Sequence, residues 1–517
     1  MCGIIGYLGK KDALSILQKG LERLEYRGYD SAGVSVLDDG GFKTVKKPGR
    51  IENLKEALKQ AKIQGSLGLG HTRWATHGEA NETNAHPHWD CRQEITLVHN
   101  GIIENYHLLK EMLIKQGHLF VSETDTEVIA HLIESHYQGD LEQAVLKILP
   151  QLQGSYALMV ASKREPDKII AARMLSPLIL GIAKDGYYLA SDVTALVDEA
   201  ALVIYLEDGE VAVIRKQGFE IKDFKGFRKS KTTSPLNWSR PAVDKNGFNH
   251  FMLKEIHEQP EVIKRNIEIY IKKDRIDFGI DQRFFQNIDR ITMVACGTAY
   301  HAGLLAEYMI EEIAGIPVTV DTSSEFRYRN SVPEENTLFI CISQSGETAD
   351  TLAGLRLGKE CGFKTLAIVN VENSTIARES DKVIYTNAGL EIGVASTKTY
   401  LSQIIILQLL ALKLTHLRRK QLPGFYHRYF TEVKKIPLYL EKILAEAPAI
   451  KSLAEELQGA SNFLYLGRGI NYPSALEGAL KLKEISYISC RRLCRRGDET
   501  RPDYFNRQRA SSGSDIA

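Results

Sequence analysis

The first 220 residues alternate short apolar runs with polar turns, a pattern typical of many short strands mixed with a few helices. Apolar residues recur at helical spacing over 12–26. Two β-rich runs flank Asp-Asp-Gly-Gly within 31–47, which predicts a hairpin. Further strands are expected at 3–8, 67–75, 95–101, 155–162, 177–191 and 210–215. The pattern predicts an α+β domain over 2–220 with a largely antiparallel sheet.

The pattern changes after this domain. The stretch 221–245 is polar and basic and contains two prolines, which predicts a linker, and 251–271 has the pattern of a helix. Buried strands then alternate with turns and amphipathic helices over 291–315 and 337–362, followed by a buried strand at 365–370. This alternation predicts an α/β domain over 246–425 with a doubly wound parallel sheet.

The last part of the chain begins as a repeat of this plan. Residues 463–488 resemble 291–315, so we expect an internal duplication whose second domain starts within 455–488. After Ile488 the apolar pattern ends. The tail 489–517 is rich in arginine and predicts no apolar strand.

Composition excludes several classes of function. The 66 basic and 65 acidic residues give a net charge of +1, which favours neither nucleic acid nor a membrane surface as a partner. The apolar run at 401–414 is expected to be too short and too polar to span a membrane, and no signal peptide is expected at the N-terminus. Seven scattered cysteines favour the reducing cytoplasm, and no His/Cys spacing indicates zinc, so no metal site is expected.

Cys2 lies directly behind the initiator Met, in "MCGIIGYLG". After removal of the Met it would carry a thiol and a free α-amine. The amine titrates near 8 and can act as the general base for its own sulfur. The alternative interpretation is an incidental cysteine close to the N-terminus.

Polar residues elsewhere in the same domain could complete a site for an α-amino acid. "GHTRWATHGE" places Arg73, Thr76 and His77 at a strand end, and an arginine fork can bind a carboxylate. Asn100-Gly101 follow an apolar strand and could form an oxyanion hole, while Asp125 could pair with an amino group. The structural alternatives are a core histidine, a turn and a helix N-cap.

A second set of polar residues occupies strand-end turns of the α/β domain, where ligands bind in open sheets. "SQSGET" offers hydroxyls and amides around Gly346 at the start of a helix, an arrangement suited to phosphate; a capping turn is the alternative. The turns within 296–303 and 391–400 supply further candidate residues. The candidate phosphate-binding residues are Thr298, Ser343, Gln344, Ser345, Thr348, Val394, Ser396 and Thr397.

The motifs "MCGIIGYLG", "LEYRGYDSAG", "HTRWATHG" and "HNGIIEN" resemble those of the glutamine–fructose-6-phosphate aminotransferase (isomerizing) family. The resemblance implies a glutaminase domain with the N-terminal-nucleophile hydrolase fold. It implies that Cys2 attacks the glutamine amide, with Asn100 and Gly101 as the oxyanion hole. It also implies Arg73 on the glutamine carboxylate and Asp125 on its amine. Trp74 would correspond to the gate for ammonia.

For the second half, the resemblance implies a pair of sugar isomerase (SIS) domains that bind a hexose phosphate. Glu484 would be the base that moves a proton between sugar C1 and C2, with Glu477 and Lys481 on the same helix face; a surface ion pair is the alternative for these two. Ala299 stands where the family often has serine. The implied reaction converts glutamine and fructose 6-phosphate to glutamate and glucosamine 6-phosphate, without a cofactor, with ammonia transferred internally in a homodimeric enzyme.

The resemblance ends at Ile488. Read in a second frame with suitable codons, 489–509 gives a family-like segment, so we expect a one-nucleotide shift near codon 489. The family's ring-opening histidine and Schiff-base lysine then have no counterpart. The alternative function is therefore a glutaminase with a sugar-phosphate-binding remnant. A regulatory sugar-phosphate-binding protein would leave Cys2 unexplained, and amidotransferases that need pyrophosphate or ATP motifs are disfavoured.

Overall fold

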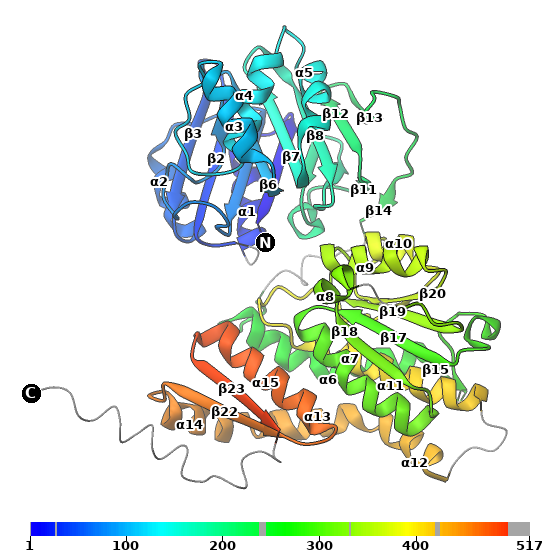
Figure 1. Ribbon diagram of the computed structural model, residues 1–517. Coiled ribbons are helices and arrows are strands. Elements are labelled where there is room, and N and C mark those ends of the chain that lie inside the picture. The colour runs from blue at the N-terminus through cyan, green and yellow to red at the C-terminus, as the bar shows by residue number, and fades with distance from the viewer. Residues whose placement is uncertain are drawn as a thin grey trace, which may run out of the picture. The chain divides into compact units, whose positions relative to one another are not determined.

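The computed structural model describes residues 2–25, 28–236, 245–273, 275–329, 332–418 and 424–494. The chain divides into two compact units, Met1–Asp244 and Lys245–Ala517, which Figure 1 shows as the blue-to-green and green-to-red parts. Each unit is described by itself below.

Two antiparallel sheets form the N-terminal unit (Figure 1). The eight-stranded sheet has the order β14-β11-β9-β10-β1-β4-β2-β3 and the six-stranded sheet the order β13-β12-β8-β7-β6-β5. The first sheet comprises β1 (Gly3–Gly9), β2 (Ser31–Asp38), β3 (Gly41–Pro48), β4 (Leu67–Arg73), β9 (Ile179–Ile182), β10 (Gly186–Ala190), β11 (Leu202–Tyr205) and β14 (Ser234–Pro235). The second comprises β5 (His88–Trp89), β6 (Ile95–Ile103), β7 (Gly154–Ser162), β8 (Glu165–Met174), β12 (Glu210–Arg215) and β13 (Gly218–Asp223). The predicted α+β class with antiparallel sheets is confirmed.

The two sheets pack face to face, and helices cover their outer faces. Strand β1 is continuously apolar because both of its faces are buried. Ile4 and Leu8 belong to the core between the sheets, whereas Ile5 and Tyr7 belong to the core under α1. A strand buried on both faces loses the polar alternation of a half-exposed one. The helices are α1 (Ala13–Leu24), α2 (Ile51–Gln60), α3 (Tyr106–Lys115), α4 (Glu127–His136) and α5 (Leu141–Ile148).

The predicted linker begins too early. Strand β13 extends to Asp223, and β14 pairs with β11 at the edge of the eight-stranded sheet, so much of 221–236 belongs to the N-terminal unit. Backbone pairing decides this boundary, because the polar side chains of these edge strands do not reveal it. Residues 237–244 lie outside the described part of the chain.

A five-stranded parallel sheet forms the centre of the C-terminal unit, in the order β18-β17-β19-β20-β21. Its strands are β17 (Arg290–Ala295), β18 (Val318–Thr322), β19 (Thr337–Ser343), β20 (Lys364–Val369) and β21 (Lys382–Tyr385). Around it lie α6 (Phe251–Tyr270), α7 (Gly297–Ala314), α8 (Ser323–Tyr328), α9 (Ala349–Glu360), α10 (Thr375–Glu379) and α11 (Lys398–Arg418), and the hairpin of β15 (Ile271–Lys272) and β16 (Arg275–Ile276) lies at one side. Helices cover both faces, so the predicted doubly wound sheet is confirmed (Figure 1). The order in which strands are added to the sheet reverses between β17 and β19, and such switch points are where these sheets bind ligands.

Helix α11 corrects the expectation for the apolar run at 401–414. It has 21 residues and is long and apolar enough, by length and composition, to cross a membrane. However, most of its apolar stretch is buried inside the unit, where the helix packs against α6 and α7. Its apolar residues therefore belong to the core of the parallel-sheet unit.

The chain continues through α12 (Gly424–Val433), α13 (Ile436–Ala445), α14 (Ala447–Leu457), β22 (Asn462–Gly467) and α15 (Asn471–Ser486). No apolar strand is expected after Ile488, yet a polar strand follows it, because β23 (Ser489–Cys494) pairs with β22 in parallel over six residues. Both strands pack against α15, so backbone hydrogen bonds complete a strand–helix–strand unit although the sequence pattern is weak. The rest of the tail, 495–517, lies outside the described residues.

Candidate active sites

Cys2 lies at the start of β1, beside the end of β4, because Gly3 pairs with Thr72 across the two strands. Its Sγ accepts a hydrogen bond from the backbone N–H of Trp74 at 3.2 Å. Burial raises the pKa of the Cys2 thiol, and the bond from Trp74 and the nearby chain terminus oppose that rise. The thiol is therefore held in place and protonated at rest, and needs a base to become a nucleophile.

Asn100 and Gly101 lie on β6, next to Cys2. The Asn100 side-chain amide donates a 2.9 Å hydrogen bond to the backbone carbonyl of Cys2. Gly101 has a φ of +134°, and a Cβ there would lie 2.0 Å from the carbonyl oxygen of Ser155. The backbone at this position is accessible only to glycine. The structure thus brings together the predicted nucleophile and the predicted oxyanion-hole residues.

Arg73 is buried at the end of β4, where its guanidinium holds the loop that follows. It donates to the backbone carbonyl of Glu79 at 3.1 Å and to that of His77. A guanidinium has five N–H donors, so these bonds leave part of the fork for a carboxylate. Thr76 is exposed, and its Oγ1 lies 3.2 Å from Nδ1 of His77. The glutamine-binding roles of these residues stay predictions.

Asp125 is buried and has its two carboxylate oxygens in different surroundings. Oδ2 accepts a 2.8 Å hydrogen bond from the Ile103 N–H, while Oδ1 lies 3.9 Å from Nδ1 of His77. One oxygen is thus fixed by the backbone, and the other is left for a cationic group. Trp74 is 42% exposed, and its ring packs edge-on against Tyr29 at 5.3 Å. Its role as a gate for ammonia stays a prediction.

Two residues near Cys2 were missed as site residues, although they belong to the motif "LEYRGYDSAG". The Asp30 carboxylate accepts hydrogen bonds from the Ala75 N–H and, at 3.1 Å, from Ser31. A Cβ at Gly28 would lie 2.6 Å from the carbonyl carbon of Arg73, so only glycine allows this approach. Both residues fix the 73–75 backbone that carries the Cys2 hydrogen bond.

A group of buried histidines beside Asn100 was also missed, because it comes from scattered positions. The rings of His71 and His86 stack at 3.9 Å, and Nε2 of His71 lies 3.0 Å from the carbonyl oxygen of His99. Burial lowers the pKa of His71 to about 3 and also lowers the pKa values of His86, His88 and His99. These rings are neutral polar supports of the site rather than charged groups.

The turn after β19 carries four of the predicted phosphate-binding residues. Oγ of Ser343 lies 3.0 Å from Oγ1 of Thr348 and accepts a 3.0 Å bond from the Gly346 N–H. Ser345 Oγ accepts a 3.1 Å bond from the Glu347 N–H, and the backbone carbonyl of Gln344 accepts one from Asn370. Gly346 has a φ of +64°, and the turn leads directly into α9. It therefore has the form of an anion-binding turn at a helix N-terminus, beside the strand-order reversal.

The loop before α11 is held by a buried carboxylate. Glu391 accepts a 2.7 Å hydrogen bond from Ser396 Oγ and a 2.8 Å bond from the Thr397 N–H. The Ser396 hydroxyl hydrogen is therefore used within the protein. Val394 is 60% exposed, so it can offer only a backbone or surface contact to a ligand.

Residues of α7 and α15 form a compact ionic cluster. Glu477 accepts a 2.9 Å hydrogen bond from Thr298, lies 2.7 Å from Nδ1 of His301 and lies 3.3 Å from Nζ of Lys481. Lys481 Nζ also donates to Glu484 at 2.6 Å. Burial raises the pKa of Glu477, but His301, Lys481 and Thr298 outweigh burial and lower it overall.

The alternative that Glu477 and Lys481 form a surface ion pair is wrong, because Glu477 is only 5% exposed. His301 was missed by the sequence reasoning. The signal that could have found it is its place three residues after Thr298, on the same face of α7. Ala299, between them, is buried and offers no polar group.

The N-terminal unit, with two packed antiparallel sheets and a cysteine beside Asn100 and Gly101, defines a glutamine amidotransferase domain, and the parallel-sheet unit defines a sugar isomerase domain. Residues 58–240 match the glutamine amidotransferase domain family, and residues 284–413 match the SIS domain family. The chain belongs to the glutamine–fructose-6-phosphate aminotransferase (isomerizing) family.

Relatives named glutamine–fructose-6-phosphate aminotransferase (isomerizing) show this membership. The Thermotoga maritima enzyme is 48% identical over 497 residues, and the Clostridium tetani enzyme is 47% identical over 494 residues. Each match covers 94% of this chain and 81% of the relative. Among solved structures, the C-terminal domain of the Francisella tularensis enzyme is 41% identical with a TM-score of 0.47, over 48% of this chain and 71% of that one.

Proposed function

We propose that this chain transfers the amide nitrogen of glutamine to fructose 6-phosphate and produces glucosamine 6-phosphate and glutamate. The observation that carries the proposal is the contact between Asn100 and Cys2 in a chain whose relatives, 48% identical, are named for this reaction. A glutaminase residue set and a sugar isomerase domain in one chain supply both halves of the reaction.

In the first half-reaction the α-amine of mature Cys2 takes the thiol proton and the sulfur attacks the glutamine side-chain carbonyl. Asn100 and Gly101 donate hydrogen bonds to the oxyanion that forms. Collapse of this intermediate expels ammonia and leaves a thioester, which water hydrolyses to glutamate and the free thiol. Arg73 holds the substrate carboxylate and Asp125 its ammonium group, with Thr76 and His77 alongside.

In the second half-reaction ammonia adds to the C2 carbonyl of fructose 6-phosphate, and loss of water gives an imine. Glu484 then takes a proton from C1 and returns one to C2, which converts the ketose imine into the amino aldose. Lys481 and Glu477 position this carboxylate and the sugar hydroxyls. The turn of Ser343, Gln344, Ser345 and Thr348 binds the phosphate, and Thr298, Val394 and Ser396 line the same ligand.

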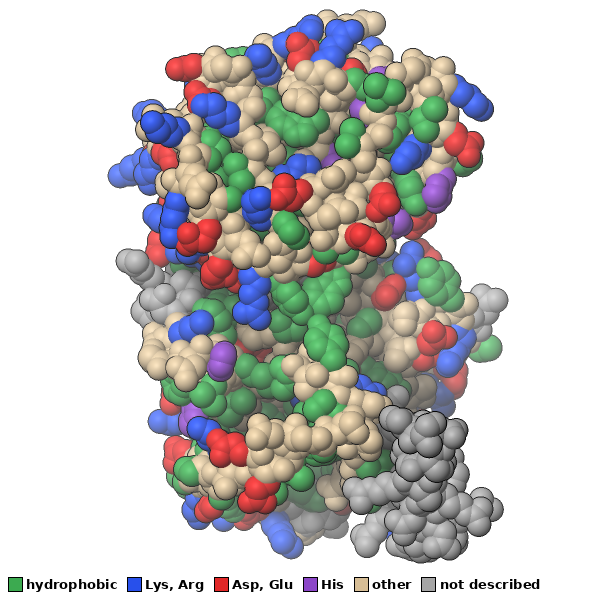
Figure 2. Space-filling model, turned by 90° about the vertical axis from the view of Figure 1, so that its left-hand side faces the viewer, with side chains coloured by type: hydrophobic (Ala, Val, Ile, Leu, Met, Phe, Trp, Pro, Cys, Tyr) green, Lys and Arg blue, Asp and Glu red, His purple; other side chains and the backbone are tan. Residues whose placement is uncertain are grey.

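The surroundings of the reaction are part of the proposal. Six described cysteines are free thiols, which supports a reducing cytoplasmic location. Basic and acidic side chains are intermixed on the face drawn in Figure 2, which suits small-molecule substrates better than nucleic acid. The enzyme acts as a homodimer and needs no cofactor; ammonia passes directly from the Cys2 site to the sugar, gated by Trp74.

The proposal is tested by incubating the purified chain with amide-¹⁵N glutamine and fructose 6-phosphate. We expect stoichiometric glutamate and ¹⁵N-labelled glucosamine 6-phosphate. Glutamate without the labelled amino sugar would show that the chain is a glutaminase only. Absence of both products from a folded, Met-free chain would refute the proposal.

A further inference from the structure

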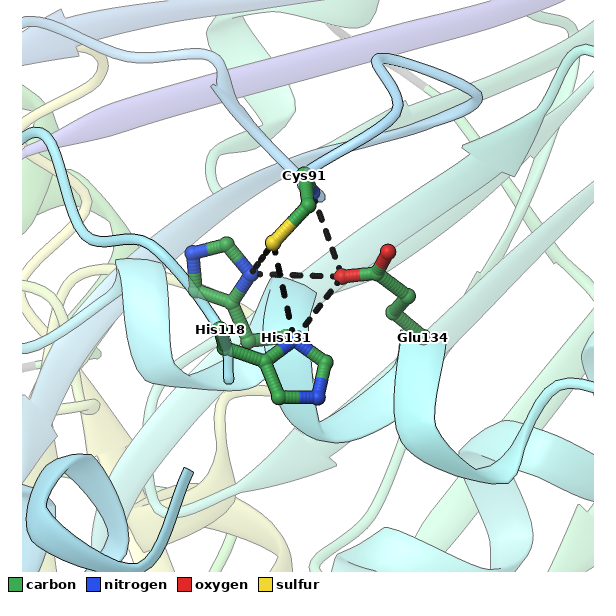
Figure 3. Close-up of side chains that lie close together, drawn as sticks. All are labelled: Cys91, His118, His131 and Glu134. Atoms are coloured by element: carbon green, nitrogen blue, oxygen red, sulfur yellow. Dashed lines mark hydrogen bonds and ion pairs between the residues drawn. The ribbon is translucent and has the colours of Figure 1, made fainter. Parts of the chain in front are cut away.

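Four side chains on one side of the N-terminal unit converge on a common centre (Figure 3). Cys91 lies in the turn between β5 and β6, and His118 follows α3. His131 and Glu134 lie one turn apart on α4. Their ligand atoms all lie within 4.8 Å of one another. This cluster is separate from Cys2 in sequence and belongs to no step of the proposed reaction.

Four distances within the cluster are close to the edges of a metal tetrahedron. Sγ of Cys91 lies 3.6 Å from Nδ1 of His118 and 3.4 Å from Nδ1 of His131. Oε2 of Glu134 lies 3.0 Å from Nδ1 of His118 and 3.4 Å from Nδ1 of His131. Zinc–nitrogen and zinc–sulfur bonds of about 2.0 and 2.3 Å at tetrahedral angles require edges of roughly 3.3–3.6 Å. Three of the four distances fall in this range, the fourth is shorter, and all the ligand atoms lie within 4.8 Å of one another, so the four donors surround a common centre.

The environment of His131 supports ligation through Nδ1. The ring is buried, and its other nitrogen, Nε2, lies 3.5 Å from Oε1 of Glu127. The Glu127 carboxylate is itself fixed by the N–H groups of Val121 and Ser122 and by the Ser122 hydroxyl. A carboxylate behind a ligating imidazole holds the proton on the far nitrogen, the usual second support of a protein zinc site.

We propose that Cys91, His118, His131 and Glu134 form a structural site for a divalent transition-metal ion of the zinc class. One thiolate, two imidazoles and one carboxylate are the borderline-soft donor set that Zn²⁺ prefers. Binding displaces the Cys91 thiol proton into solvent. Four protein ligands complete the tetrahedron, so the ion fastens the β5–β6 turn and the α3–α4 connection to α4 and leaves no position for a substrate.

The expectation of no metal site rests on sequence spacing alone, and the proposed site departs from it. Only His131 and Glu134 are close in sequence; Cys91 and His118 are brought to them by the fold. Linear spacing detects sites built on one loop or hairpin, whereas this cluster combines three separate segments.

The test uses the full chain, stripped with a chelator and titrated with Zn²⁺ against a competing chromophoric chelator. We expect each chain to bind one Zn²⁺ ion tightly, and we expect the melting temperature of the N-terminal unit to rise. Co²⁺ should give the intense visible bands of a tetrahedral ion and a thiolate charge-transfer band in the near ultraviolet. Cys91→Ser should remove that charge-transfer band and weaken Zn²⁺ binding at least about a hundredfold.

Matched variants separate this site from adventitious binding. His118→Ala should weaken Zn²⁺ binding, whereas His107→Ala, an exposed histidine on α3, should not. Cys2→Ala should still bind one Zn²⁺ ion tightly. Cys361→Ser should keep the Co²⁺ spectrum of the parent chain. Absence of a tight equivalent in the parent chain, or an unchanged Zn²⁺ affinity in folded Cys91→Ser and His118→Ala, would overturn the proposal, independently of the reaction proposed above.

Discussion

The side-chain amide of Asn100 donates a 2.9 Å hydrogen bond to the backbone carbonyl of Cys2. This bond joins β6 to the residue directly before β1, and so joins the two sheets of the N-terminal unit at the nucleophile. Asn100 therefore holds the backbone of the cysteine, and in the proposed reaction its amide would also donate a hydrogen bond to the oxyanion.

Asn100→Ala should lower kcat for glutamine hydrolysis by about 10²–10³, the usual cost of one lost oxyanion donor, with a smaller change in KM. Steady-state measurements of glutamate release give kcat and KM separately. Asn53→Ala is the matched control, because Asn53 makes the same kind of amide-to-carbonyl bond, to Pro48, on α2. Equal rates for Asn100→Ala and the parent would contradict the role of this residue.

Cys2→Ala should abolish glutamate release and leave the circular dichroism spectrum and melting temperature unchanged. Among the described residues, the hydrogen bonds of the thiol are to the Trp74 backbone, so its removal costs little stability. Mass spectrometry should show that the active protein begins at Cys2. An active protein that retains the initiator Met would disprove the α-amine as the base.

Glu484→Gln should stop formation of the amino sugar and leave glutamine hydrolysis intact, because the two chemistries use different units. Its carboxylate accepts a 2.6 Å hydrogen bond from Lys481. The side-chain amide of glutamine cannot act as a base in place of this carboxylate. Glu456→Gln, on α14, is the control. A normal yield of glucosamine 6-phosphate from Glu484→Gln would assign the proton transfer to another group.

The double change Ser345→Ala and Thr348→Ala should weaken binding of fructose 6-phosphate by at least about a hundredfold, because each lost hydrogen bond to an anion costs about 1.5–3 kcal/mol. Isothermal titration measures this affinity, and glutamine hydrolysis should be unchanged. Thr319→Ala, at an exposed position of β18, should bind normally. Unchanged affinity in the double variant would leave the turn as a helix cap only.

Acid should destabilise the N-terminal unit through its buried histidines. In the folded state His71 stays neutral until its pKa of about 3, whereas in the unfolded chain histidine takes up a proton below about 6.5. The unfolded state therefore binds more protons in this window. The free energy of unfolding falls as the pH decreases from about 6.5 towards 3.

Urea denaturation at a series of pH values measures this slope. His71→Gln, which cannot titrate, should reduce the slope by up to about 1.4 kcal/mol per pH unit, whatever it does to stability at neutral pH. His107→Gln, at an exposed position, should leave the slope unchanged. An equal slope in the parent and in His71→Gln would show that His71 is protonated in the folded state.

The fold could be predicted where one periodicity dominates. The apolar run of β1, the hairpin of β2 and β3, and the strand–turn–helix plan around β17 and β19 follow from burial on one or two faces. The prediction failed at β14 and β23, which are polar strands recognised only through their pairing with β11 and β22. Edge strands depend on backbone hydrogen bonds more than on side-chain burial, so their sequences carry little signal.

The candidate sites show the same limit at the level of side chains. Glu477 and Lys481 followed from the resemblance to the family, whereas Asn100 and Gly101 could be chosen from one motif. His301 and the Cys91 cluster could not, because the segments that carry their partners meet only in the folded chain. The sequence also does not reveal that Arg73 and Glu391 form hydrogen bonds with the loops that follow them.

The left-handed backbone of Gly101, with the Ser155 carbonyl oxygen 2.0 Å from where a Cβ would lie, has a genetic consequence. Any single-nucleotide change of a glycine codon that changes the amino acid inserts a residue with a Cβ or stops translation. Every missense mutation at this codon would therefore meet the same steric block beside the nucleophile. In a saturation library selected for growth without external amino sugar, this codon should survive only through its synonymous forms.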